Sequence, residues 1–474
     1  MNTINKINYQ KIKNGILMIL LSIWILIPLL KEIKLTAHYV NIHEYDYMKI
    51  LAIVGIYIIT YEIYKKFLAC QNKKDFLKEL LPILILLLYL IWTLISALCA
   101  KDKELAFWGT SYRQDGYITY LTYAGFFACA FLIESKKIRK YLLNLFVFVA
   151  TVNVILFQLT NYGYLYNIFR FQNPTLGVFY NSNHYGYYLL MALTTIAILF
   201  ITEKNKISKA LYILSYILVL YYFILNNTFG CYIAFFITII IFFVYEIYKK
   251  ENVKASVVFL TIFIIMSFAV QSNGENIVMK NVSVLFTDIG KIINIDTPEN
   301  GIIDKQLKEN NSNYSDDTKI KNKNKNEIDN QEYGSNSNKE SSSWQKAGSG
   351  RAQLWKYGIQ IFLEKPIIGY GPENLEKEYD RFNIQQDRPH NLIIQLATTS
   401  GIIGLLLYCT AIGIIIIKGI KKLKEKESMQ KLVLFVIIAY LISAMFGNSM
   451  YYTSPYFFIF LGWLMRDNIE NKYI

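Results

Sequence analysis

Charged side chains are scarce inside the long apolar runs of this chain. The run from Leu392 to Ile417 contains none, and Lys49 and Glu62 stand only at the ends of another run. Because a charge buried in hydrocarbon is costly, such residues usually mark an ion or proton path where they occur. Their scarcity argues against a proton-coupled transporter and favours chemistry at a membrane surface.

Cysteine and paired acidic residues are also sparse. The five cysteines are scattered and odd in number, so they indicate neither a disulfide framework nor a zinc site. No Asp-x-Asp pair stands in a loop that we expect to be ordered, which argues against a metal-dependent sugar-nucleotide site. We therefore expect no metal and no cofactor.

What the chain has in abundance is apolar sequence, since 54% of its 474 residues are hydrophobic. A helix needs ~20 mostly apolar residues to cross a hydrocarbon core of ~30 Å. The pattern predicts an all-α polytopic membrane protein with about twelve transmembrane helices. The predicted spans are 15–31, 47–64, 79–99, 117–133, 141–160, 184–202, 209–226, 228–246, 255–271, 392–417, 432–449 and 454–466.

The net charge of +14 follows the topology of these spans. Lysine and arginine concentrate in alternate connecting segments, as the positive-inside rule describes for cytoplasmic loops. This placement predicts that both termini are cytoplasmic and that the long segment after the ninth span lies outside. It also argues against nucleic acid as a partner. The basic segments are the N-terminus, 65–78, 134–140, 203–209, 247–254, 418–431 and the C-terminus.

The predicted spans and their orientation divide the chain into three parts. Residues 1–270 would form transmembrane helices 1–9, residues 271–391 an extracytoplasmic loop, and residues 392–474 helices 10–12 with a cytoplasmic tail. Within the loop, 304–346 is polar and too poor in apolar residues to order itself, so we expect disorder there. Helical periodicity returns afterwards, and 348–388 is predicted to form a helical cap.

The cap should contain two short helices. Apolar spacing predicts the first from Arg351 to Glu364, and a second, polar helix is expected from Glu373 to about Phe382. The acidic residues of the second helix are expected to form a solvated face. They are Glu373, Glu376, Glu378 and Asp380.

A histidine stands at the rim of the tenth span, in Pro389-His390-Asn391. A neutral imidazole near its working pKa can take a proton from an attacking hydroxyl. Asn391 could orient that imidazole or bind the acceptor, and the alternative is that His390 only caps the helix. Gly401 and Gly404, further along the same span, are expected to let another helix approach closely.

Three arginines are candidates for binding an anionic leaving group. Arg351 opens the first cap helix, whereas Arg170 and Arg113 lie in the other two outer loops. Guanidinium binds phosphate oxygens bidentately and stays charged, which suits a diphosphate. The alternatives are a solvated surface arginine or an interfacial anchor for lipid head groups. Asn183 follows Arg170 at the mouth of the sixth span.

Taken together, these elements resemble the O-antigen ligase and O-antigen polymerase superfamily over about 165–450. The sequence departs from the family pattern at Tyr185 and Gly186 and in the polar insert ahead of Arg351. The matching residues are His390-Asn391 with Gly401 and Gly404, Ser349 to Trp355, the turn Glu364 to Gly371, and Gly177 followed by Asn181-Ser182-Asn183.

The resemblance implies a metal-independent, inverting glycosyltransferase in the bacterial cytoplasmic membrane. Such an enzyme passes a glycan from a polyprenyl-diphosphate donor to a hydroxyl of a glycan, lipid, wall or protein acceptor on the outer face. Carried over, His390 would be the base, while Arg351 and Arg170 would bind the diphosphate. The other candidate substrate-binding residues are Asn391, Arg113, Asn183, Gly369 and Gly371.

Other functions stay open from the sequence. A ligase and a polymerase that joins lipid-linked repeat units are not distinguished by these residues. A transporter or flippase of lipid-linked sugars would be expected to show internal repeats and ionisable residues within its spans. A membrane scaffold would not need arginines and a histidine on its outer face.

Overall fold

A computed structural model defines the fold over 3–31, 33–35, 38–39, 43–165, 168–169, 177–179, 181–272, 274–293, 350–423 and 428–469. Two compact units are present, one formed by Met1–Asn281 with Leu354–Ile474 and the other by Val282–Gln353. The predicted disordered segment 304–346 lies outside the described residues. The division of the chain at 271 and 391 stays a prediction.

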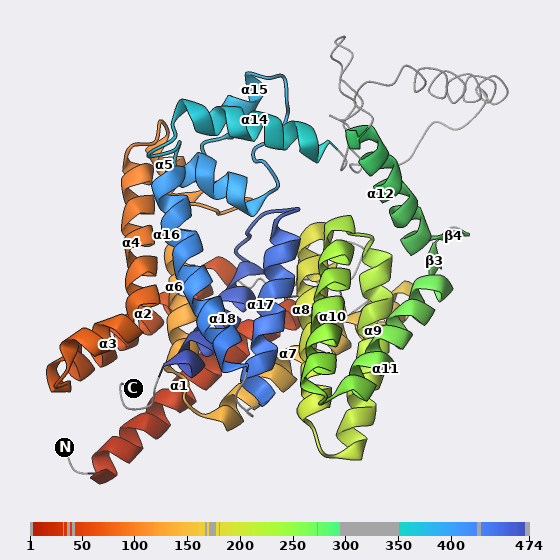
Figure 1. The fold of residues 1–474 in the computed structure, drawn as a ribbon, viewed down its shortest axis with the longest axis horizontal. Coiled ribbons are helices and arrows are strands. Elements are labelled where there is room, and N and C mark those ends of the chain that lie inside the picture. Colours follow the sequence, from red (N-terminus) through yellow and green to blue (C-terminus); the bar gives the residue numbers. More distant parts are fainter. Residues whose placement is uncertain are drawn as a thin grey trace. The chain divides into compact units, whose positions relative to one another are not determined.

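The described residues are almost entirely helical (Figure 1). Two short antiparallel pairs, β1 (Lys34–Leu35) with β2 (His38–Tyr39) and β3 (Gln271–Ser272) with β4 (Glu275–Asn276), interrupt the helices. The helices are α1 (Thr3–Leu30), α2 (Glu44–Ala69), α3 (Lys73–Glu79), α4 (Leu81–Leu98), α5 (Lys103–Trp108), α6 (Tyr117–Leu132), α7 (Lys136–Asn161), η1 (Gly177–Phe179), α8 (Ser182–Thr202), α9 (Lys206–Asn226), α10 (Phe229–Lys249), α11 (Val253–Ala269), α12 (Ile277–Ile293), α14 (Arg351–Glu364), α15 (Glu376–Asp380), α16 (Leu392–Lys422), α17 (Ser428–Ala444) and α18 (Ser454–Asn468).

Each of the predicted spans coincides with one of these helices. Within the described residues, eight helices are long and apolar enough to cross a membrane, and Tyr117–Leu132, Val253–Ala269 and Val433–Ala444 are shorter apolar helices. The all-α membrane architecture is therefore confirmed in outline, and the number of spans and their orientation stay predictions.

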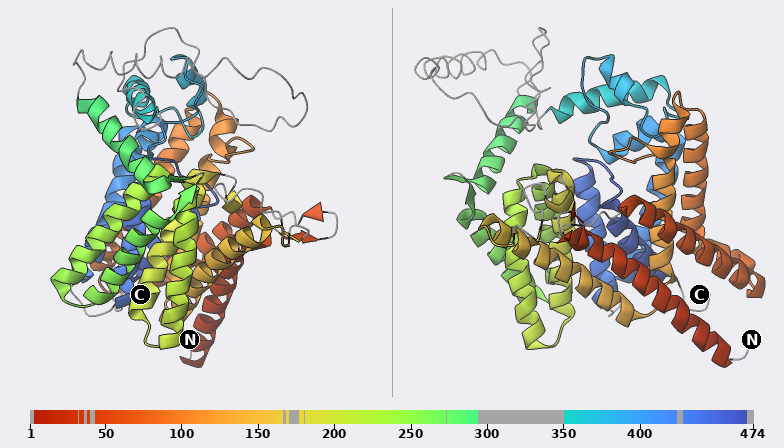
Figure 2. Two further views of the ribbon diagram at one scale, coloured as in Figure 1. Left: turned by 90° about the vertical axis from the view of Figure 1, so that its right-hand side faces the viewer. Right: turned by 180° about the vertical axis from the view of Figure 1, so that it is seen from behind.

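Small residues set the spacing of the central helices. α6 packs between α2 and α18, and α1 runs alongside α7 (Figure 2). A Cβ at Gly125 of α6 would overlap the backbone of Ala52 in α2, and one at Gly462 of α18 would overlap the carbonyl of Phe127. Glycine at these positions allows the backbones to touch, as is common between membrane helices.

The first cap helix is confirmed as α14, whereas the second is only α15 and thus shorter than predicted. Both belong to a small core of Leu354, Ile361, Tyr370, Leu375 and Tyr379. The charged residues that follow α15 lie on the loop that leads to α16.

Gly401 breaks α16, and a turn of the cap packs against it, whereas we expected another helix to approach at this position. Its backbone has φ 66° and ψ −176°, and a Cβ there would overlap the carbonyl of Ile367. The amide of Ile402 donates to Pro366 O at 2.7 Å, and the amide of Tyr370 donates to Thr398 O at 2.9 Å. The turn thus supplies partners for backbone groups that the broken helix leaves unpaired.

Candidate active site

His390 lies immediately before α16, and its backbone is unusual. Its φ is +50°, a conformation that costs a non-glycine residue roughly 1–2 kcal/mol. The next residue, Asn391, caps α16 by accepting the amides of Ile393 at 3.0 Å and Ile394 at 3.1 Å. The Asn391 Nδ2 donates to Met445 O at 3.0 Å, so it also ties α16 to the end of α17.

Two amide side chains hold the ring of His390. Gln386 Oε1 lies 3.3 Å from its Nε2, and Asn448 Nδ2 lies 3.1 Å from its Nδ1. Gln386 is half-buried and belongs to the cap loop, which is the segment 381–391 between α15 and α16. Asn448 belongs to the segment between α17 and α18 and is 4% exposed. The ring is therefore fixed by two segments that are distant in sequence.

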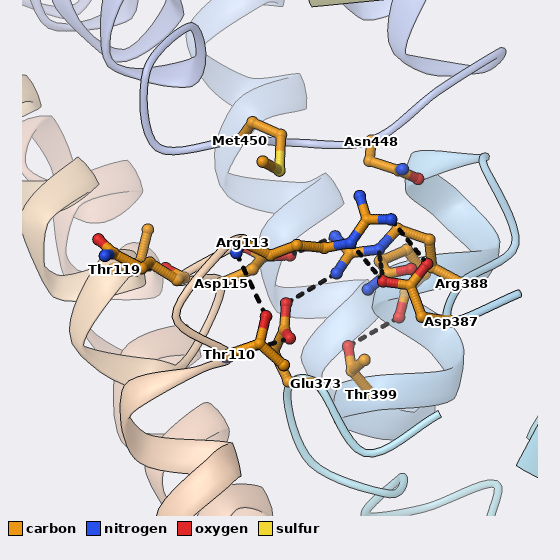
Figure 3. Close-up of polar contacts among 12 residues, drawn as sticks. Thr110, Arg113, Asp115, Thr119, Glu373, Asp387, Arg388, Thr399, Asn448 and Met450 are labelled. Atoms are coloured by element: carbon orange, nitrogen blue, oxygen red, sulfur yellow. Dashed lines mark hydrogen bonds and ion pairs between the residues drawn. The ribbon is translucent and has the colours of Figure 1, made fainter. Parts of the chain in front are cut away.

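Arg388 lies two residues before His390 and is the centre of a buried ion cluster (Figure 3). Its side chain is 1% exposed and contacts three carboxylates. Its Nη1 donates to Asp115 at 3.1 Å, its Nη2 to Glu373 at 2.7 Å and its Nε to Asp387 at 3.0 Å. The cluster thereby joins the loop before α6 to the segments on either side of α15.

Arg113 completes the cluster from the loop before α6. Its Nε lies 2.5 Å from Asp387 Oδ2, and its Nη2 donates to Asp387 Oδ1 at 3.1 Å (Figure 3). Arg113, a predicted contact of the diphosphate, therefore already binds a carboxylate bidentately through Nε and Nη2. An incoming diphosphate would have to share Arg113 with Asp387 or displace it.

Two guanidinium groups face three carboxylates in this cluster, and the pKa values reflect the imbalance. Burial raises the pKa of Asp115 to about 7 and outweighs the opposing effect of Arg388. For Asp387, burial acts in the same sense, but Arg388 and Arg113 outweigh it and lower its pKa. Burial would lower the pKa of Arg388, yet the carboxylates raise it above its ordinary value. A proton on Asp115 can thus balance the excess negative charge near neutral pH.

The Asp115 carboxyl should make the stability of the fold depend on pH. Its pKa of about 7 in the fold exceeds the ordinary 3.8, so folding favours the protonated form. That stabilisation is complete below the ordinary pKa and is lost as the pH rises through about 7.

We therefore expect the Tm of the wild type, relative to that of Asp115→Asn, to fall between about pH 5 and about pH 8. Thermal unfolding of both purified proteins across this range measures it. A difference that stays flat or grows with pH would contradict the assignment.

His184 is a second histidine near the cluster, and it was not among the predicted site residues. It is buried in the first turn of α8, with its Nδ1 3.3 Å from Thr453 Oγ1. The charges of Arg113, Arg388 and His390 all act on it. Asn181 positions it by accepting its backbone amide at 3.3 Å, which caps α8.

The remaining predicted site residues lie in different places. Asn183 is half-buried in the first turn of α8. Arg351 is the first residue of α14 and belongs to the smaller unit, whereas α14 from Leu354 onward belongs to the larger one. Arg170 lies outside the described residues. Gly369 and Gly371 form the turn at Gly401, with φ of +80° and +87° and backbones packed against Thr399 and Ala100 respectively.

The expectation of a solvated acidic face on the second cap helix was wrong for Glu373. Glu373 is only 9% exposed and binds Arg388. The sequence held one signal for the cluster, because Asp387-Arg388 stands directly before Pro389-His390-Asn391. Two opposite charges next to a candidate base, at the start of an apolar span, predict that each charge is buried and paired with other charged groups. Their identity could not be read from spacing, since Asp115 lies far away in sequence.

Comparison with known proteins supports the resemblance noted in the sequence. Residues 214–409 match a family model described as O-Antigen ligase. This stretch includes Arg351, Glu373, Arg388 and His390, but not Arg113, Asp115 or Asn448. No curated protein matches the chain.

Proposed function

We propose that this membrane protein, a member of the O-antigen ligase superfamily by its match over residues 214–409, is a glycosyltransferase of the O-antigen ligase type. It transfers a glycan from a polyprenyl-diphosphate donor to an acceptor hydroxyl on the outer face of the membrane, without a metal. One observation carries the proposal. A strained histidine is clamped by two amides beside a buried cluster that contains two arginines.

The chemistry requires a base and a site for the departing anion. The acceptor oxygen attacks the anomeric carbon, the bond from that carbon to the diphosphate oxygen breaks, and the hydroxyl proton passes to His390. Polyprenyl diphosphate leaves with the bonding electron pair, and fixed guanidinium groups stabilise its charge. We assign this binding to Arg351 and Arg170, with Arg113 as a further contact.

The positioning of His390 supports its role as base. A group that must meet a hydroxyl within hydrogen-bond reach has to be held in one orientation, and the two amides provide that hold. Strained backbone of this kind is typical of sites where geometry is imposed by the surroundings. The acceptor decides between a ligase and a polymerase, and the length of the product distinguishes them.

Replacing His390 by alanine should slow glycan transfer by ~10²–10⁴-fold, since a positioned base contributes about that much. Turnover of lipid-linked oligosaccharide by the purified protein in lipid nanodiscs measures it. His43→Ala is the matched control because His43 is exposed at the start of α2. Both variants should keep the Tm of the wild type to within a few degrees. Undiminished transfer by His390→Ala would remove His390 from the mechanism.

A further inference from the structure

The side chain of Asn448 can serve either hydrogen-bonding state of the Nδ1 of His390, because an amide offers both a donor and an acceptor. Its Nδ2 lies 3.1 Å from the Nδ1 of His390, so in this orientation it donates to that nitrogen, and the neutral ring carries its hydrogen on Nε2, toward Gln386 Oε1. Its Oδ1 is buried and has no hydrogen-bond partner within the described part of the chain. A buried carbonyl oxygen without a partner is costly, and this one lies on an amide whose other end contacts a ring that can carry a hydrogen.

A protonated imidazole has a hydrogen on each ring nitrogen and therefore needs acceptors on both sides. Half a turn of the Asn448 amide exchanges its nitrogen and oxygen and places Oδ1 against Nδ1. In that orientation the side chain accepts a hydrogen on Nδ1, first in the neutral ring, whose Nε2 then carries none, and afterwards in the imidazolium that forms when Nε2 takes a proton. Carboxylic side chains often play this part for catalytic histidines, but here a neutral amide stands at the position.

We propose that Asn448 is a positioning residue for glycan transfer: with its Oδ1 turned to His390 it accepts the Nδ1 hydrogen, and it thereby selects the tautomer whose Nε2 carries no hydrogen and can take the proton of the acceptor hydroxyl. The proposal rests on the proposed function, in which His390 is the base. Gln386, half-buried and 3.3 Å from Nε2, marks the side of the ring that the acceptor hydroxyl would approach.

Several charged groups surround the ring and set the background for any titration. Asp387, in the cap loop, is paired with Arg388 of the same loop and with Arg113 of the loop before α6. His184 faces the ring from α8, and electrostatic interactions link His390 to both His184 and Asp387. A carboxylate in place of the Asn448 amide would be a further charge, in direct contact with Nδ1.

The test uses Asn448→Asp and Asn448→Ser, with Gln385→Glu as a matched control. Gln385 is an exposed amide of the same cap loop, so its replacement adds the same charge away from the ring. The chain has only four histidines, so NMR of histidine-labelled full-length protein in nanodiscs can follow each ring. The signal that disappears in His390→Ala assigns His390.

In Asn448→Asp, the pKa of His390 should rise by about 1–3 units, because an opposite charge in contact favours the imidazolium. The acidic limb of the rate profile should move upward by the same amount. In Asn448→Ser, whose shorter side chain cannot reach Nδ1, kcat should fall roughly 10–100-fold with KM unchanged. Gln385→Glu should leave both readouts unchanged.

The outcomes separate this inference from the proposed function. An unshifted His390 signal in Asn448→Asp, with a normal Tm, would show that the contact does not exist. A shifted signal with an unmoved rate profile would remove Asn448 from catalysis. If His390→Ala still transfers glycan at full rate, the base assignment fails, and the NMR shift alone then reports the contact. If Asn448→Asp does not fold, full activity of Asn448→Ser overturns the proposal.

Discussion

Replacing Arg388 by methionine is expected to leave little folded protein. Methionine fills a similar volume, but Asp115, Glu373 and Asp387 would then remain with Arg113 as the only guanidinium of the cluster. Removing one partner of a buried ion pair typically costs ~3–5 kcal/mol, because the uncompensated charge stays out of water. Here one arginine serves three carboxylates, so the upper end of that range is expected.

Arg381 provides the matched control for Arg388. It lies seven positions earlier and pairs with Glu364 and Glu378, but its side chain is 46% exposed. Exposed pairs contribute about 0–1 kcal/mol, so Arg381→Met should fold almost normally. The fraction of monodisperse protein in size-exclusion chromatography and its Tm report the difference.

A lower pH and the removal of one carboxylate should each raise the folded fraction of Arg388→Met. Adding Asp115→Asn removes one unpaired carboxylate, and a lower pH lets Asp115 take up a proton. Each should restore part of the folded fraction. If Arg388→Met and Arg381→Met behave alike, the buried cluster does not support the fold.

Gly401→Ala is expected to be the second most damaging change. The backbone of Gly401 has φ 66° with an extended ψ, a region that is essentially restricted to glycine. A side chain there costs ~1–3 kcal/mol in strain alone. The added methyl would also overlap the carbonyl of Ile367, which is backbone and cannot rotate away. The turn would have to leave α16, and the loop that carries Arg388 and His390 would move with it.

Gly413→Ala, in the same helix, should change the Tm in the opposite direction or leave it unchanged. No atom lies within 4 Å of a Cβ added at Gly413, and alanine is favoured over glycine in a helix by about 1 kcal/mol. We expect Gly413→Ala to keep or raise the Tm, and Gly401→Ala to lower it and to slow glycan transfer. Equal Tm values for the two variants would argue against the break in α16.

The helices were largely predictable because their signal is local. Apolar runs located every helix of the bundle, and the spacing of apolar residues predicted α14 with both its ends. The second cap helix was overestimated, since a polar stretch such as Glu373 to Phe382 carries no periodicity strong enough to fix its ends.

The surroundings of the histidine were predictable only in part. His390 stood out by its position, but its two partners come from separate places, Gln386 in the cap loop and Asn448 after α17, and the ion cluster draws Asp115 from a third. The chain brings these together by tertiary packing, and no spacing in the sequence records that. Gly401 was similarly expected to contact a helix, because a glycine pattern does not tell a helix from a turn.

The break in α16 has a mechanical consequence for the histidine. Leu392 to Ser400 is anchored at one end by Asn391 and at the other by the turn Pro366–Gly371, with Trp92 donating to Ser400 O at 2.8 Å. This segment is therefore fixed to the cap and to α4, and the longer remainder of α16 lies beyond the break at Gly401. A tilt of that longer segment is therefore expected to leave the imidazole in place beside the ion cluster.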